Sequence, residues 1–211
     1  LFVFCKSLNG LNPVGLHAYD GHHRDADLNV RTKGCDAGFE RVLNLKQTIA
    51  AQTGVETTIV TSGNTTISIH SKRKNIEVSP GTFIFWDYGY HKQFAEQPFV
   101  FAALLITRII SKPDDETLCI DLGHKAVASE NPLNNRVYFL NAPELQACGH
   151  SEEHLILKAP KGNSYKVGDV LYGVPFHICP TVALHETLAV VENNVVTKTW
   201  NVVARKRKIT I

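Results

Sequence analysis

The sequence lacks the features that mark several special classes of protein. No apolar run approaches the roughly 20 residues that a membrane-spanning helix needs, and there is no secretory signal pattern. The formal net charge of +2 gives no indication of nucleic-acid binding. The five cysteines have no disulfide-like spacing, so we expect reduced thiols in a cytoplasmic protein. Methionine is absent, and because translation starts with methionine, we expect that Leu1 is not the biological start.

What the sequence contains is typical of a soluble globular protein. Its 211 residues, 44% of them hydrophobic, are enough for one or two domains. Strand and helix signals alternate in residues 1–97, and a 3.6-residue apolar period over 37–52 predicts a helix that Gly54 ends. Strands separated by helices predict parallel βα units. The expected strands are 14–19, 57–61 and 82–86, with a polar loop over 20–36.

The pattern changes near residue 98, and residues 98–211 show strand and turn signals only. This predicts an antiparallel β domain. Asn193 and Asn194 lie between the last two strand signals, as expected of a tight hairpin. The expected strands are 99–111, 117–121, 136–140, 154–158, 169–172, 184–192 and 195–204.

The segment YGVPFHICPTVALHE places His177 and Cys179 two residues apart, just before Pro180. The residue before a proline favours extended geometry, and residues two apart in a strand face the same side. The imidazole and the thiol are therefore predicted to reach one divalent metal and to leave coordination positions open, as catalytic sites do. The alternative is a buried histidine and cysteine that only pack.

Three stretches of residues 1–97 also carry polar groups suited to chemistry. The turn 61–66 follows a β-branched strand, and its small residues allow backbone N–H groups to approach a phosphate; a plain turn explains it equally well. The stretch 17–25 has several ionisable side chains after a strand. It is typical of an active site, and the alternative is a surface loop. The stretch 85–90 ends a strand with Asp87 and Tyr90, which as an alternative are a strand cap and a packed aromatic.

Together these stretches resemble the D-threonine aldolase / D-serine dehydratase-like proteins, which are pyridoxal-phosphate enzymes of the alanine-racemase fold type. The resemblance covers nearly the whole chain, and the combination of DLGHKAVASE, SEEHL and HICPTVALHE favours the D-threonine aldolase branch. It implies an α/β plus all-β fold. Residues 1–97 would be the C-terminal part of a TIM (β/α)8 barrel, and residues 98–211 the antiparallel β domain that carries the metal pair.

The resemblance also implies roles for individual residues. His177 and Cys179 would bind a divalent metal, zinc or manganese, and a thiolate ligand favours zinc over magnesium. His22 and Asp25 would be the catalytic acid/base positions. The positions that would bind pyridoxal 5'-phosphate are Tyr19, Ser62, Gly63, Asn64, Thr65, Asp87 and Tyr90.

The implied activity is cleavage of D-threonine and other D-β-hydroxy amino acids to glycine and an aldehyde. Retro-aldol cleavage requires the β-hydroxyl to lose its proton, and the candidate base is His22, or Asp25 through a water. The alternative within the family is D-serine dehydratase, which forms pyruvate and ammonia. The expected substrate is a small D-amino acid, and the protein is expected to form a homodimer. Neither a nucleic acid nor a membrane is expected as a partner.

The lysine that binds pyridoxal phosphate in this family has no match in the sequence. A full barrel takes about 250 residues, so this lysine is expected upstream of Leu1. The fragment alone is then expected to be inactive. A non-catalytic truncated fragment is the alternative from outside the enzymes.

Overall fold

The computed structural model describes residues 1–206 and 208–209. The remaining positions of the expected β domain, 207 and 210–211, lie outside the described residues. In the described part of the chain, no helix is both long and apolar enough to span a membrane.

The chain forms two compact units. The first contains residues 1–83 and 93–97, and the second contains residues 84–92 and the chain from 98 onward. The domain boundary that the sequence places at residue 97 stays a prediction.

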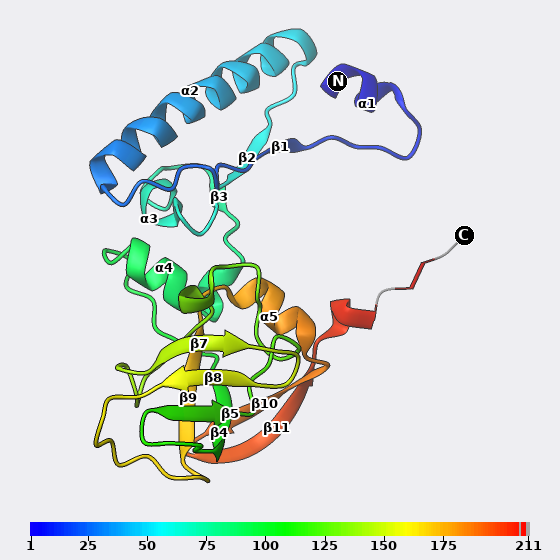
Figure 1. Ribbon diagram of the computed structural model, residues 1–211. Helices are drawn as coiled ribbons and strands as arrows, with labels where there is room; N and C mark the ends of the chain where they lie inside the picture. The colour runs from blue at the N-terminus through cyan, green and yellow to red at the C-terminus, as the bar shows by residue number, and fades with distance from the viewer. Residues whose placement is uncertain (207, 210–211) are drawn as a thin grey trace. The chain divides into compact units, whose positions relative to one another are not determined.

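The first unit is built on three parallel strands in the order β1-β2-β3 (Figure 1). A long helix links β1 to β2 and a short one links β2 to β3, which confirms the predicted parallel βα units. Strand β1 pairs with β2 from Gly15 opposite Thr58 to Ala18 opposite Thr61, so both strands end at the same edge. The elements are α1 (Phe2–Ser7), β1 (Gly15–Ala18), α2 (Leu28–Thr53), β2 (Thr58–Thr61), α3 (Ile67–His70), β3 (Glu77–Val78) and η1 (Thr82–Ile84).

Helix α2 begins well before the predicted start, so the polar loop predicted over 20–36 was wrong beyond residue 27. Asp27 caps the helix, and its carboxylate accepts hydrogen bonds from the N–H groups of Asn29 and Val30. The first turns lack an apolar period because Arg31, rather than a hydrophobic residue, is buried there. The predicted end is confirmed: Gly54 is the C-cap, with a left-handed φ of 68°.

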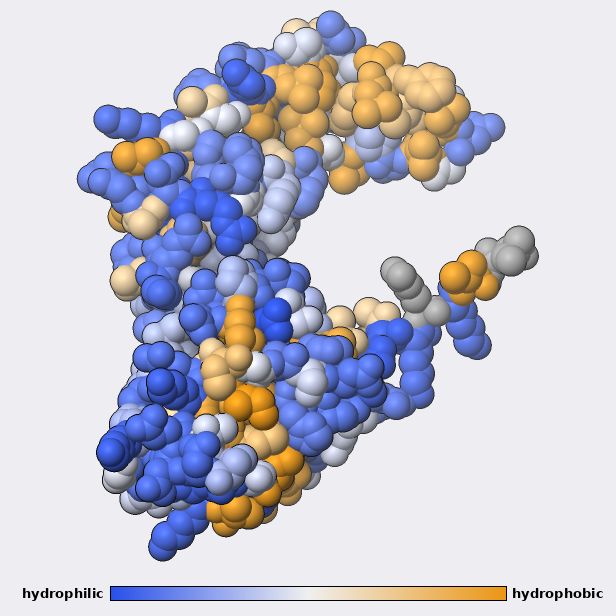
Figure 2. Space-filling model, viewed as in Figure 1, coloured by the Kyte–Doolittle hydropathy of each residue, from blue (hydrophilic) through white to orange (hydrophobic). Residues whose placement is uncertain are grey.

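The core of the first unit forms where α2 covers the strands, around the buried side chains of Phe39, Ile49 and Ile59. Helix α1 buries none of its residues. Figure 2 shows hydrophobic residues gathered on the surface over α1, where Val3 and Phe4 are exposed. Hydrophobic burial therefore fixes α2 in this unit, whereas α1 has little packing of its own.

The strand predicted over 82–86 was wrong. Residues 82–84 form the 3-10 turn η1, and Trp86 has a left-handed φ of 51°, a conformation that a strand does not accommodate. Asp87 follows Trp86 directly and precedes helix α4 (Tyr88–Gln93). Asp87 therefore begins a helix instead of ending a strand.

The second unit confirms the predicted antiparallel β structure. Six strands pair antiparallel in the order β6-β9-β4-β5-β8-β7, and their alternate inward residues form its core, including Leu118, Leu157 and Leu171. The elements are β4 (Leu105–Ser111), β5 (Thr117–Ile120), η2 (Leu133–Asn135), β6 (Val137–Phe139), β7 (Gln146–His150), β8 (Leu155–Lys158) and β9 (Val170–Pro175). Strand β7 was not predicted, and residues 99–104, predicted as strand, precede β4 as non-strand chain.

The last two strands form the predicted hairpin. β10 (Thr187–Glu192) pairs antiparallel with β11 (Val195–Asn201), before the short turn η3 (Val203–Lys206). Asn193 and Asn194 both have left-handed φ, 53° and 64°, as a two-residue hairpin turn of the primed type requires.

Candidate functional site

The extended segment predicted around His177 and Cys179 was wrong, because Cys179 lies in helix α5 (Ile178–Leu184). His177 is the N-cap residue of this helix, with extended φ and ψ of −140° and 101°. Pro180 is the third residue of α5, in the first turn, where the missing N–H of proline costs no helical hydrogen bond. The histidine and the cysteine thus stand at the start of a helix and not along a strand.

The imidazole of His177 is held by a carboxylate that the sequence analysis did not select. Nδ1 of His177 lies 2.6 Å from Oε1 of Glu130, and both side chains are about half exposed. A carboxylate on one ring nitrogen fixes the tautomer and the orientation of the ring, leaving Nε2 as the acceptor for a metal. The Cys179 side chain is exposed two residues further on.

Asp87 is fully buried and caps two helices. Its Oδ1 accepts a hydrogen bond from the N–H of Tyr90 in α4, and its Oδ2 accepts one from the N–H of Ile178 in α5, at 2.9 and 3.0 Å. Gly89 lies so close to the segment before α5 that a Cβ there would be 2.4 Å from the carbonyl oxygen of Phe176. These contacts fix the start of α5, and therefore His177, within the second unit.

Tyr90, predicted as a cofactor-side residue, lies in α4 and stacks on Trp86, with ring centroids 5.3 Å apart. In the compact units, Asp87 and Tyr90 belong with the β domain residues and not with the parallel strands. Their assignment to cofactor binding stays a prediction.

In the first unit, the turn after β2 has the features of an anion site. Ser62 is buried with a φ of 95°, a strained value for a residue with a Cβ, and its hydroxyl donates to the carbonyl of Gly63. Thr65 is 1% exposed, and its hydroxyl makes no hydrogen bond within the described residues. A buried hydroxyl without a partner costs free energy unless a ligand satisfies it. Asn64 instead uses its side-chain oxygen to accept from the N–H of Phe83.

Tyr19 follows β1 and lies over this turn. A Cβ on Gly63 would lie 3.0 Å from the Tyr19 ring, so a larger residue there would displace this exposed ring by a few tenths of an ångström. Tyr19 and His22 line a hollow of about 160 Å³ in the first unit, together with the buried Cys35 and His70. Asp25 is exposed and does not line this hollow; its backbone carbonyl accepts from the buried guanidinium of Arg31.

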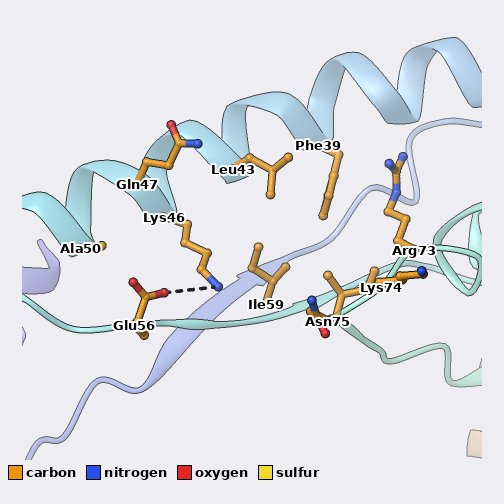
Figure 3. A pocket seen from close by; sticks show the side chains of 11 residues that line it. Phe39, Leu43, Lys46, Gln47, Ala50, Glu56, Ile59, Arg73, Lys74 and Asn75 are labelled. Atoms are coloured by element: carbon orange, nitrogen blue, oxygen red, sulfur yellow. Dashed lines mark ion pairs between the residues drawn. The ribbon is translucent and has the colours of Figure 1, made fainter.

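A second hollow of the first unit contains none of the predicted site residues. It measures about 500 Å³ and lies between the inner face of α2 and the segments around β2 and β3 (Figure 3). Phe39, Leu43 and Ile59 form its apolar wall, and the Lys46–Glu56 ion pair lies at one end. The predicted residues thus form two separate candidate sites, one at the ends of β1 and β2 in the first unit and one at the start of α5 in the second unit.

The residues present fit both groups that the sequence predicts. For a phosphate, the first unit offers the hydroxyl of Thr65, which has no hydrogen-bond partner within the described residues. It lies two residues from Gly63, which is close to the ring of Tyr19. For a metal, the second unit offers the carboxylate-held imidazole of His177 and the thiol of Cys179, a nitrogen and sulfur donor set that suits zinc.

Comparison with solved structures defines the class of the fold. A D-threonine aldolase from Filomicrobium marinum superposes with a TM-score of 0.81 at 24% identity, over 96% of this chain and 56% of that one. An alanine racemase-like protein from Idiomarina loihiensis superposes with a TM-score of 0.75 at 18% identity, over 95% and 58%. The chain therefore has the alanine racemase-like fold, with part of the barrel followed by a β domain.

Sequence comparison confirms the resemblance to the D-threonine aldolase / D-serine dehydratase-like family. The putative serine dehydratase domain family matches residues 102–191. A D-threonine aldolase from Arthrobacter sp. is 26% identical over 208 residues, 95% of this chain and 53% of that protein. A 3-hydroxy-D-aspartate aldolase from Paracoccus denitrificans (strain Pd 1222) is 25% identical over 90% of this chain and 51% of that protein. The chain spans about half the length of the curated relatives it matches.

D-threo-3-hydroxyaspartate dehydratase from Delftia sp. HT23 matches with a TM-score of 0.71 at 18% identity, over 91% of this chain and 56% of that one. Solved variants of D-threo-3-hydroxyaspartate dehydratase replace a cysteine by alanine, in a metal-free form, and a histidine by alanine.

Proposed function

We propose that the whole protein is a pyridoxal-phosphate- and divalent-metal-dependent D-threonine aldolase, which cleaves D-threonine to glycine and acetaldehyde. The observation that carries the proposal is His177, oriented by Glu130 at 2.6 Å and followed two residues later by an exposed cysteine. The Arthrobacter relative and the metal-free cysteine variant of D-threo-3-hydroxyaspartate dehydratase support it.

Two groups supply the chemistry when bound: pyridoxal phosphate stabilises negative charge at Cα, and a divalent cation makes a hydroxyl more acidic. The hydroxyl of Thr65 would donate to the cofactor phosphate, and the ring of Tyr19 would lie against the cofactor. Nε2 of His177 and the sulfur of Cys179 would hold the cation, and zinc matches this pair better than manganese.

The proton of the substrate β-hydroxyl needs an acceptor. His22 is exposed and lines the same hollow as Tyr19, so its imidazole is our candidate base. Asp25 lies outside that hollow and is the weaker candidate, acting through a water.

The runner-up activity is dehydration, in which the same residues would serve D-serine or a 3-hydroxy-D-aspartate. The match to the putative serine dehydratase domain over residues 102–191 favours it. A homodimer and a cytoplasmic location accompany both proposals, and a fragment without activity is the remaining alternative.

The test is to assay the purified whole protein with D-threonine, D-serine and D-threo-3-hydroxyaspartate, with and without added zinc or manganese. Glycine and acetaldehyde from D-threonine, lost on chelation, would support the aldolase. Pyruvate from D-serine would instead support the dehydratase activity. If no substrate gave a product under any metal condition, both activities would be rejected.

A further inference from the structure

Asp20 joins the ends of two neighbouring parallel strands. It comes two residues after β1, and its Oδ1 accepts hydrogen bonds from the N–H of Gly63 at 3.2 Å and from the hydroxyl of Thr66 at 2.5 Å. Both donors belong to the turn after β2, the turn that contains Ser62 and Thr65. One carboxylate therefore spans the first and last parts of the candidate phosphate turn.

The second carboxylate oxygen of Asp20 also has a close hydrogen-bond partner. Oδ2 lies 2.6 Å from Nε2 of the buried His70, whose Nδ1 accepts a hydrogen bond from Nε of Arg73 at 3.1 Å. Because the guanidinium can only donate, Nδ1 carries no proton and Nε2–H is the group that donates to Asp20. Arg73 also binds Asp36 at 2.5 Å, so the chain of contacts ends on helix α2.

The ionisation of the group follows from these contacts. Burial alone raises the pKa of Asp20, but the hydrogen bonds from His70 and Thr66 outweigh it and leave the pKa below its ordinary value. Burial, with the nearby Asp20 charge, raises the pKa of the Cys35 thiol to about 12, so this thiol stays protonated beside the carboxylate.

A metal site is the competing interpretation of this cluster. Asp20, Cys35 and His70 offer ligand atoms within 4.8 Å of one another. Both ring nitrogens of His70 are already engaged, however, one by Asp20 and the other by Arg73. A cation there would also lie close to the Arg73 guanidinium. The contacts therefore favour a hydrogen-bonded support over a metal site.

We propose that Asp20, supported by His70, is a positioning residue that sets the turn 62–66 in its phosphate-binding conformation. This inference rests on the proposed function. The Gly63 N–H is shared between Oδ1 of Asp20 and the hydroxyl of Thr66, so the buried, unpartnered hydroxyl of Thr65 is the donor that the turn still offers to a phosphate. Asp20 also holds the turn against the strain of Ser62 at φ 95°. In this proposal Asp20 acts through the turn, although its side chain also lines the hollow that contains Tyr19 and His22.

The test compares binding of pyridoxal phosphate and of pyridoxal, which lacks the phosphate, to the cofactor-depleted whole protein by calorimetry. In Asp20→Asn one carboxylate oxygen becomes an N–H₂ donor, which in either orientation meets another donor, the Nε2–H of His70 or the N–H of Gly63. We expect the affinity for pyridoxal phosphate to fall by about tenfold or more, as for a lost hydrogen bond to a charged group. The affinity for pyridoxal should change by less than about twofold, far below that effect. Glu40→Gln, at an exposed carboxylate of α2, is the matched control.

Thr66→Val is a second, milder variant that removes one donor to Asp20 and keeps the shape of the side chain. It should lower the pyridoxal phosphate to pyridoxal affinity ratio in the same direction and shift the ³¹P resonance of the bound cofactor. An unchanged ratio in both variants, or an equal loss for both ligands, would overturn the role of Asp20. A wild-type protein that binds pyridoxal as tightly as its phosphate would instead overturn the proposed phosphate site, and this inference with it.

Discussion

Oε1 of Glu130 lies 2.6 Å from Nδ1 of His177, although the two residues are 47 positions apart in the chain. The contact leaves the other ring nitrogen of His177 as the only one that a metal can use. Glu130 therefore holds His177 in the orientation that the proposed metal site would require.

Replacing either proposed ligand should empty the metal site without unfolding the β domain. We expect His177→Ala and Cys179→Ala to lose most of the bound metal, because each removes one of the two protein ligands. Metal content by elemental analysis is the measurement, and the thermal unfolding midpoint should move little, since both side chains are largely outside the core. Cys148→Ala, at another exposed cysteine, is the control; full metal content in both ligand variants would contradict the assignment.

Glu130→Gln should weaken metal binding without abolishing it. Changes in such outer partners typically cost about 10- to 100-fold in metal affinity. A competition titration with a chromogenic chelator measures this, and Glu192→Gln, at an exposed glutamate of β10, should behave like the wild type. If Glu130→Gln binds metal as tightly as the wild type, the orientation of His177 does not depend on this carboxylate.

Asp87→Ala should destabilise the second unit. It removes the caps of α4 and α5 together, and at about 1–2 kcal/mol for each cap the free energy of unfolding should fall by roughly 2–4 kcal/mol. Urea unfolding followed by circular dichroism measures the loss. Asp115→Ala, at an exposed aspartate before β5, should have almost no effect. If the free energy of unfolding fell no more in Asp87→Ala than in Asp115→Ala, the two caps would contribute nothing to stability.

The stability of the first unit should depend on pH through Asp20. Its pKa is depressed in the folded state, because the hydrogen bonds from His70 and Thr66 outweigh burial. The stabilisation is thus fully present above the unfolded-state pKa of about 3.9, and it is lost as the pH falls through the lower folded-state value. We expect Asp20→Asn to be less stable than the wild type at pH 7 and the difference to shrink toward pH 3. Urea unfolding at several pH values measures it; a difference independent of pH would contradict the charged hydrogen-bond network.

Local signals in the sequence predicted much of the fold. The β-branched run before Ser62 and the cap at Gly54 gave the parallel βα pattern, and Asn193-Asn194 gave the last hairpin. The start of α2 was missed because its first turns bury Arg31 rather than an apolar side chain. The Asp27 cap was the signal that could have found it. Helix α5 was missed because Pro180 argued for extended chain, although proline is tolerated in a first helical turn.

The candidate site was less accessible to sequence reasoning. Family motifs selected Tyr19, His22 and the turn 62–65, and the structure places Tyr19 over that turn. Glu130 ends the motif DLGHKAVASE but was given no role there, and His70 lies in no motif, because the roles of both residues depend on partners 47 and 50 residues away. Only the pairing of β1 with β2 could have indicated that Asp20 meets the turn after β2, since parallel strands end at one edge.

The hydrogen bond from the N–H of Ile178 to Asp87 closes a loop of 91 residues that contains the whole six-stranded sheet. Closing so long a loop is entropically costly until the intervening strands have paired, so this contact should form late in folding. The start of helix α5, with His177 and Cys179, then takes its final geometry only after the sheet has formed. A chelator should accordingly remove the proposed cation from the native protein without unfolding the sheet. Small zinc-binding domains behave differently, because they fold only when the metal is bound.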